Sequence, residues 1–201
     1  MVRAIGVPLR RGALLLLVVV ALVGGAPVPG DAATTDDDWT VEAVPGSDLR
    51  FSFPGTWQVA SSEQLARLRA AMPTEGTGID MLLAVIDPAG ANDNISVNRY
   101  SGTDAAEWWT NFAEFRSTME LSADQSDGKV VAMGKRRVGG RPLYWSIERD
   151  PDPIVGVPML FTEIELREAK DVVLTFSVTI STQSPHPLAT TRRVIAGITS
   201  G

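Results

Sequence analysis

The chain has 201 residues, of which 18 are basic and 24 acidic, so its net charge is −6. An acidic chain without an extended basic run argues against binding to nucleic acid or to anionic membrane surfaces. The absence of cysteine excludes disulfides, cysteine-ligated metal sites, thiol nucleophiles and a lipid-modified N-terminal cysteine. The length suffices for one self-standing domain with a sizeable core, and we expect one domain.

The N-terminus has the charged, apolar and small-residue order of a secretory signal peptide. Three arginines precede the apolar run 13–23, and small and turn-forming residues follow it. This run is about a dozen residues long, whereas a helix needs about 20 apolar residues to span a bilayer. Residues 1–32 are therefore predicted to be a signal peptide for the general secretory route, cleaved near Ala32–Ala33. The alternative is an uncleaved N-terminal membrane anchor. Cleavage would remove three arginines and one aspartate and change the net charge from −6 to −8.

Residues 33–47 are predicted to be an acidic, turn-rich linker. The stretch "TTDDDW" has three adjacent aspartates and no apolar periodicity, and "VPGSD" has the composition of a turn. A calcium-binding loop needs alternating carboxylates, so adjacent ones favour a solvated tether. The domain itself is then expected to span residues 48–201.

The domain is predicted to open with a strand, a corner and a helix. Apolar and polar residues alternate over 49–53 ("LRFSF"), which is typical of a half-buried strand. The Pro-Gly dipeptide that follows ends this strand, and Trp57 and Val59 are expected to return to the apolar side, with Trp57 buried. A Ser-x-x-Gln capping box at Ser61 predicts a helix that ends at Met72, before a proline.

Two strands and a second helix come next. Met81–Asp87 is apolar throughout, as in a central strand covered on both faces. Asn94–Tyr100 is its expected antiparallel partner. Apolar residues at three- and four-residue spacing predict a helix over Asp104–Leu121, with Trp108 on the buried stripe and Trp109 about 100° around the helix from it.

Two hairpins and a terminal helix complete the chain. Gly139-Gly140 is a strong two-residue turn signal between strands Val130–Val138 and Arg141–Arg149. A second hairpin is expected around Ala169-Lys170, and a helix over Leu188–Ile198. Hairpins indicate an antiparallel sheet, which the helices must cover, so the fold class is α+β.

The stretches "FSFPGTW", "VGGRPLYW" and "ELREAKDVVLTFSV", together with the terminal helix, resemble the PsbP-like fold. That fold is an α/β/α sandwich with a central antiparallel sheet and is shared with the Ran-binding Mog protein. Within it, the chain is most similar to the LpqN/LpqT-type envelope proteins of bacteria, over residues 39–201. Those proteins are typically lipoproteins, and this chain lacks the required cysteine. The resemblance implies a binding or assembly accessory and supplies no catalytic residues.

The candidate catalytic groups are few. His186, the one histidine, lies between two prolines, and Ser184 is two residues away. Side chains two residues apart in such a proline-restricted loop rarely point at each other, as a serine nucleophile and its histidine base must. Glu163 and Glu165 lie two apart on a strand, about 7 Å from each other, which is a separation that a glycosidase can use. Arg167 continues the same face and favours a solvated, salt-bridged stripe. A secreted hydrolase that uses Glu163/Glu165 or His186 is the alternative function.

The residues give no metal, cofactor or phosphate site. A single histidine and no cysteine are a poor ligand set for zinc. Asp150 and Asp152 alternate as calcium ligands do, but no bidentate glutamate follows them. We therefore assign no catalytic, cofactor-binding or metal residue.

The remaining candidates are binding surfaces. Aromatic side chains could line a groove for an apolar or sugar ligand, or be buried between layers. The basic residues at the first hairpin tip either neutralise neighbouring acids or contact an acidic partner or an anionic lipid head group. The predicted function is an exported, non-enzymatic binding or accessory protein of the bacterial cell envelope or extracellular space, with an envelope protein, a lipid or a glycolipid as partner. The candidate binding surface is Lys135, Arg136, Arg137, Arg141, Trp109 and Tyr144.

Overall fold

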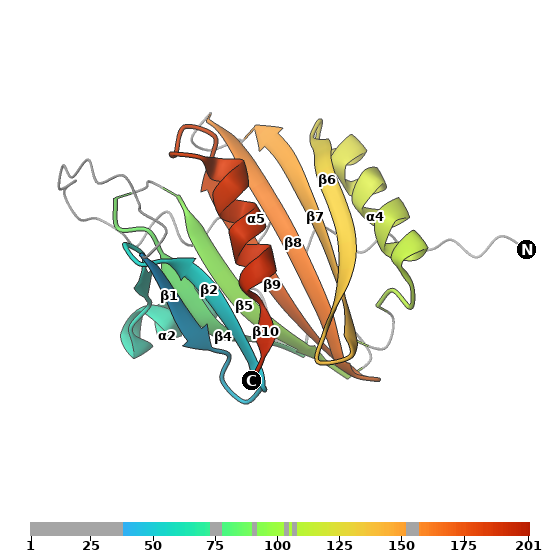
Figure 1. Ribbon diagram of the computed structural model, residues 1–201, viewed down its shortest axis with the longest axis horizontal. Helices are drawn as coiled ribbons and strands as arrows, with labels where there is room; N and C mark the ends of the chain where they lie inside the picture. Colours follow the sequence, from blue (N-terminus) through green and yellow to red (C-terminus); the bar gives the residue numbers. More distant parts are fainter. Residues whose placement is uncertain (1–37, 73–77, 90–91, 103–104, 106–107, 152–156) are drawn as a thin grey trace, which may run out of the picture.

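The structure is a computed structural model that describes residues 38–72, 78–89, 92–102, 105, 108–151 and 157–201. Its centre is a seven-stranded antiparallel sheet (Figure 1). In spatial order the strands are β3 (Gln58–Val59), β4 (Ile79–Ile86), β5 (Asn94–Ser101), β9 (Val172–Ser181), β8 (Pro158–Ala169), β7 (Arg141–Pro151) and β6 (Lys129–Val138). A separate three-stranded sheet has the order β1 (Trp39–Ala43), β2 (Leu49–Pro54) and β10 (Thr199–Ser200).

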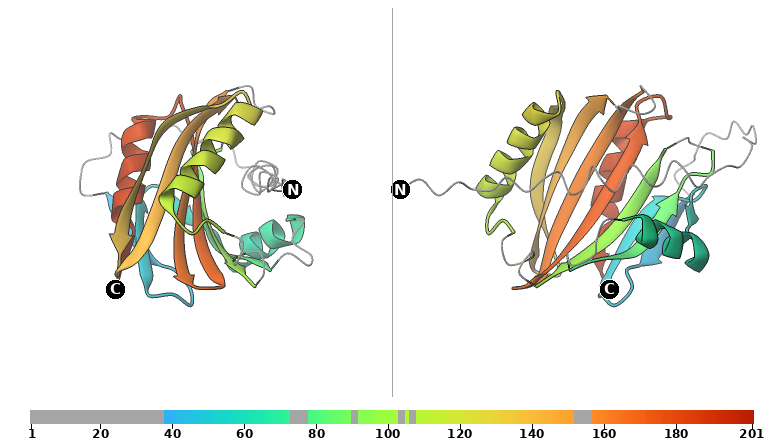
Figure 2. Two further views of the ribbon diagram at one scale, coloured as in Figure 1. Left: turned by 90° about the vertical axis from the view of Figure 1, so that its right-hand side faces the viewer. Right: turned by 180° about the vertical axis from the view of Figure 1, so that it is seen from behind.

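Helices cover both faces of the large sheet (Figure 2). On one face, α5 (Pro187–Gly197) packs against β8, β9 and β2 of the small sheet. On the other face, α4 (Phe112–Gln125) packs against β6 and β7, and α2 (Ser62–Ala71) packs against β4. The predicted α/β/α sandwich with a central antiparallel sheet is confirmed, and the small sheet beside α5 is an addition that the sequence did not indicate.

The main core lies between the large sheet, α5 and the small sheet. Phe51 of β2 is fully buried and meets Phe176 of β9 with ring centroids 5.6 Å apart. Trp57 is 7% exposed and belongs to the same core, so its predicted burial is confirmed. The prediction for Val59 is wrong, because this residue is 40% exposed on the two-residue edge strand β3.

The predicted linker 33–47 is partly wrong. Trp39–Ala43 forms strand β1, which pairs with β2 in antiparallel register and so belongs to the domain. Trp39 packs against the main core and lies under the Arg193 guanidinium, which is 4.5 Å from the ring centroid. The predicted signal peptide lies outside the described residues, and no helix within the described ranges is long and apolar enough to cross a membrane.

The local turn and cap predictions are largely confirmed. The capping box at Ser61 is present, with Gln64 as its partner. Gly139 and Gly140 have φ angles of +55° and +79° and connect β6 to β7, as a two-residue hairpin turn requires. In the second hairpin Ala169 still belongs to β8 and pairs with Val172, so the turn lies one residue later than predicted.

The second helix begins later than predicted. Helix α4 starts at Phe112, whereas apolar periodicity had suggested a start at Asp104. The side chain of Asn111 accepts hydrogen bonds from the backbone N–H groups of Ala113 (2.9 Å) and Glu114 (3.1 Å). An N-cap of this kind fixes the first turn of a helix, so Trp108 and Trp109 precede α4 and are not on its surface.

We expect Asn111→Ala to reduce the free energy of unfolding by about 1 kcal/mol, because two backbone N–H groups lose their acceptor. Urea unfolding of the variant checks this value. Asn111→Asp is the control, since aspartate can accept the same bonds, and it should retain most of the stability. Equal stability of Asn111→Ala and the wild type would contradict a helix start at this cap.

Candidate ligand-binding site

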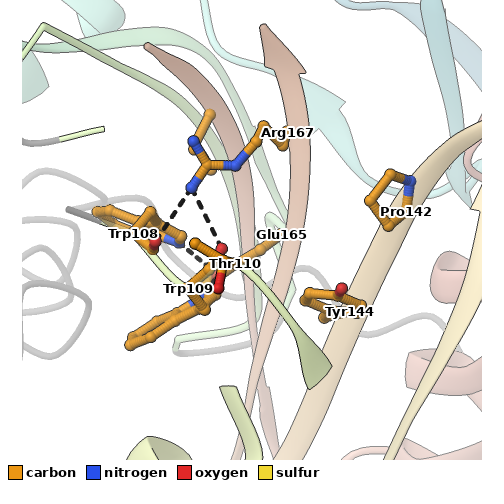
Figure 3. A pocket seen from close by; sticks show the side chains of 8 residues that line it. Trp108, Trp109, Thr110, Pro142, Tyr144, Glu165 and Arg167 are labelled. Carbon is orange, nitrogen blue, oxygen red and sulfur yellow. Dashed lines mark hydrogen bonds between the residues drawn. The ribbon is translucent and has the colours of Figure 1, made fainter. Parts of the chain in front are cut away.

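A small pocket lies beside α4, on the face of the large sheet opposite α5. Figure 3 shows the side chains that line it, which are those of Trp108, Trp109, Thr110, Pro142, Tyr144, Glu165, Arg167 and Val173. The ring centroids of the two tryptophans are 5.5 Å apart, and both Trp109 and Tyr144 also contact the buried ring of Phe115 from α4. The pocket has a volume of about 50 Å³, which is room for a few water molecules and not for a sugar or lipid.

Glu165 is the polar centre of this pocket. Its side chain is 3% exposed, and one of its oxygens, Oε2, accepts hydrogen bonds from the indole Nε1 atoms of both Trp108 and Trp109. The predicted solvated stripe is therefore wrong for Glu165. The physical reason is that the sheet is covered on both faces, so the polar positions of a central strand are buried as well.

Arg167 holds the backbone of the same tryptophan segment. Its Nη2 donates to the carbonyl oxygens of Trp108 (3.1 Å) and Trp109 (3.2 Å), and its Nη1 donates to those of Ala105 (3.3 Å) and Lys170 (2.7 Å). The planar guanidinium suits such forked contacts. Two residues of β8 thus fix the tryptophan segment, Glu165 through the side chains and Arg167 through the carbonyls (Figure 3).

The two glutamates on this face have raised pKa values. Burial, reinforced by the charge of Glu163, raises the pKa of Glu165 well above its usual range, and the Trp108 hydrogen bond and Arg167 oppose this less strongly. Burial also raises the pKa of Glu163 to about 7, against the lowering effect of a hydrogen bond from the Ser177 hydroxyl (2.9 Å) and with a further increase from Glu148. In both glutamates, burial disfavours the charged carboxylate relative to the protonated acid.

The pocket continues into a stretch of sheet that we call the polar face. It consists of side chains of β5, β7, β8 and β9 on the face away from α5. Figure 2 shows α2 and α4 on this face, where α2 packs on β4 and α4 packs on β6 and β7. All its members except Glu163 are less than 9% exposed. The polar face comprises Asn94, Ser96, Asn98, Ser146, Glu148, Asp150, Glu163, Glu165, Thr175, Ser177 and Thr179.

Several polar atoms of this face lack a hydrogen-bond partner among the residues that the structure describes. They are Asn98 Oδ1, Ser146 Oγ, Thr175 Oγ1 and Thr179 Oγ1, and each of these side chains is at most 1% exposed. The strand register places Ser146 directly opposite Glu163, and Thr175 directly opposite Glu165. Buried polar groups are nearly always hydrogen-bonded in folded proteins, so these atoms make the polar face a candidate binding surface.

The structure separates the predicted binding residues into two places. Trp109 and Tyr144 line the pocket together, whereas the basic residues of the hairpin tip are absent from its lining. The hairpin residues have contacts within the fold. Arg136 donates to the Ile195 and Ile198 carbonyls at the end of α5. Arg137 donates to the Gly140 carbonyl, and Arg141 donates to both carboxylate oxygens of Asp48. Lys135 lies over the Phe112 ring. These contacts favour the interpretation in which the tip residues are satisfied internally.

The alternative catalytic residues do not meet. His186 is exposed at the start of α5, on the opposite face of the sheet from Glu163. The Ser184 hydroxyl donates to the carboxyl group of Asp93 (2.5 Å). Burial raises the pKa of Asp93. Within the described ranges, no group of three or more histidine, aspartate or glutamate side chains is placed to hold a metal ion.

Sequence reasoning missed Glu165 and Arg167 as partners of the tryptophans. A signal was nevertheless present, because β5, β8 and β9 all alternate apolar and polar residues although a central strand of a sandwich has no solvated face. Polar residues on such strands must be buried. The sequence could not show which of them face one another, since that depends on the strand order.

Comparison with known proteins identifies the fold alone. No protein-family model and no curated protein sequence matches the chain. The chain is similar to the solution structure of PsbP from the cyanobacterium Synechocystis sp. PCC 6803, with 13% identity, a TM-score of 0.52, and coverage of 88% of this chain and 100% of that one. It is also similar to LpqN of Mycobacterium tuberculosis, described as involved in cell envelope biogenesis, with 9% identity, a TM-score of 0.46, and coverage of 82% and 92%. The predicted resemblance to the PsbP-like fold is confirmed.

Proposed function

We propose that the protein is an exported, non-enzymatic binding or accessory protein of the bacterial cell envelope or the extracellular space, and that its ligand lies on the polar face. The observation that supports this most strongly is the set of buried polar atoms without partners on that face. Leaving such groups unpaired costs about 1–3 kcal/mol each, and a ligand that pairs with them would recover this free energy. The N-terminal pattern of a signal peptide supports export.

Several features favour binding over catalysis. One oxygen of Glu165, Oε2, already accepts two indole hydrogen bonds, which favours a role for this carboxyl in holding the tryptophan segment. The pocket itself is too small to hold the scissile bond of a sugar or an ester together with its flanking groups. The tryptophan segment is held from both its side chains and its carbonyls, as a rigid binding platform requires.

A hydrolase that uses Glu163 is the second candidate, because a buried carboxyl with a pKa of about 7 is suited to general acid catalysis. Turnover of nitrophenyl glycosides and esters by the purified protein tests this candidate. Turnover that Glu163→Gln abolishes would favour the hydrolase. The binding proposal predicts no turnover above the buffer rate.

The binding proposal is tested by capture of partners from envelope extract, with mass spectrometry of the bound proteins and lipids. Ser177→Arg places a guanidinium on the polar face beside Glu163, where it should occupy the site and abolish capture. Ser96→Arg, at an equally buried position on β5, provides a second blocking variant if the first does not fold. Thermal unfolding by circular dichroism establishes that each variant is folded.

The matched control is the double variant Lys135→Gln/Arg137→Gln at the hairpin tip, because both side chains are exposed and neither forms an ion pair within the described part of the chain. Capture should persist in this control. Loss of capture in the hairpin variant, with normal capture by Ser177→Arg, would move the binding surface to the hairpin tip.

A further inference from the structure

Glu163 and Glu165 are the two carboxyls of the polar face that lie nearest the tryptophan segment. No ion pair within the described residues involves Glu163 or Glu165. The guanidinium of Arg167 on the same strand donates to four backbone carbonyls. The hydrogen-bond donors that reach the two carboxyls are uncharged, namely two indoles and one hydroxyl.

The atoms without partners on this face are all oxygens that can accept a hydrogen bond: three hydroxyl oxygens and the amide oxygen of Asn98. Together with the carboxyls they form a surface rich in acceptors. The hydroxyls can also donate, whereas an ionised carboxylate can only accept. An ammonium group has three donors and a guanidinium has five, so organic cations match the carboxylates best. The side chains here are not placed to hold a metal ion within the described ranges.

The spacing of the acceptors indicates an extended ligand. Residues two apart on a strand lie about 7 Å from each other on one face, so Glu163 with Ser146 and Glu165 with Thr175 form two successive rows at that separation. Asn98 lies two strands away from β8, about 10 Å across the sheet. A single ammonium group reaches one row, whereas an extended polypeptide presents every second side chain on one side at the same repeat of about 7 Å.

We propose that the polar face binds an extended polypeptide segment with lysine or arginine side chains at alternate positions, whose cationic groups pair with Glu163 and with the second oxygen of Glu165. This inference rests on the proposed function, in which the polar face is the ligand surface. The acidic charge of the whole chain assists the approach of such a ligand.

Binding should depend on pH, because pairing with a cation requires the carboxyls to release their protons. The charged groups that face Glu163 are Glu148 and Asp150 from β7 and Glu165 and Arg167 from β8, whereas β5 and β9 present uncharged side chains to this face. The charged side chains of α4, such as Glu114 and Glu120, are exposed. Since the pKa of Glu163 is about 7, affinity should rise between pH 5.5 and pH 8.

The probe is a labelled peptide of four Lys-Ser repeats, titrated with the full chain at pH 8 and low salt by fluorescence anisotropy. The wild type should bind it, and should not bind the matched peptide of four Glu-Ser repeats. Glu163→Gln/Glu165→Gln should weaken binding by about tenfold or more, because it removes both charges without a change in shape. Glutamine mimics the protonated acid, so this variant should fold.

The matched control is Glu63→Gln/Glu120→Gln, which removes the same net charge from two exposed helix positions and should change affinity by less than about twofold. Equal weakening by both double variants would overturn the proposal, since it would show attraction to net charge alone. Spermine that binds as tightly as the peptide would overturn the polypeptide assignment.

If the peptide does not bind while Ser177→Arg abolishes envelope capture, this inference is wrong and the proposed function stands. If Ser177→Arg has no effect on capture, the proposed function fails as well.

Discussion

The protein should be less stable at pH 8 than at pH 5 by about 2.5 kcal/mol, because Glu163 must lose its proton in a site that is largely shielded from solvent. Its pKa is about 7 in the folded chain, compared with 4.5 for an unperturbed glutamate. Between pH 4.5 and pH 7, Glu163 therefore keeps a proton in the folded state that it has released in the unfolded state. The free energy of unfolding therefore falls as pH rises from about 4.5, and the contribution of Glu163 levels off above pH 7. Glu165 acts in the same direction, since its pKa is raised too.

Urea unfolding at pH 5, 6, 7 and 8 measures this dependence. Glu163→Gln should flatten it, with little change in stability at pH 5 and a gain of about 2.5 kcal/mol over the wild type at pH 8. Glu63→Gln is the control, because Glu63 is exposed on α2 and should leave the pH dependence as it is. A wild-type stability that is constant over this range, or a loss of stability in Glu163→Gln at pH 8, would contradict the burial of an unpaired carboxyl on the polar face.

Trp57→Ala should reduce the free energy of unfolding by about 3–5 kcal/mol, since it removes a large side chain from the main core and leaves a cavity. Trp57 is 7% exposed, and its backbone N–H donates to the Pro54 carbonyl (2.9 Å) in the corner after β2. The Trp57 side chain therefore packs in the main core at the corner where the chain passes from the small sheet to the large sheet. Thermal or urea unfolding of the variant measures the effect.

Val59→Ala is a matched control two residues further along the chain. Val59 is 40% exposed, so its truncation should cost less than about 0.5 kcal/mol. Similar losses for the two variants would show that the corner after β2 is not a packed part of the core. An unchanged melting temperature for Trp57→Ala would place the indole at the surface.

Where local chemistry decides an element, the sequence predicted it well. The capping box at Ser61 and the turn at Gly139-Gly140 depend on a few adjacent residues, and both are present. Apolar periodicity alone failed at α4, because it runs on through Trp108 while the cap at Asn111 starts the helix. Periodicity cannot show that an indole has a distant acceptor on β8. Strand β1 was missed since it is short and follows an acidic run.

The candidate site was predictable in part. Trp109 and Tyr144 were named from the sequence, and the structure brings them into one pocket. Glu163 and Glu165 were correctly placed on one face but assigned to solvent, because Arg167 suggested an exposed stripe of paired charges. Arg167 donates instead to backbone carbonyls. The distinction depends on the strand order, which places β8 in the interior of the sheet.

Site-specific photo-cross-linking in cells that produce the protein tests directly whether the ligand lies on the polar face. Phe161 lies two residues before Glu163 on the same face of β8 and is partly exposed, so benzoylphenylalanine can replace it with little disturbance. The comparison position is Arg137 at the hairpin tip, which is exposed. We expect a discrete cross-linked partner from position 161 and none from position 137, and we expect Ser177→Arg to abolish the adduct at position 161. An adduct from position 137 alone would contradict a ligand site on the polar face.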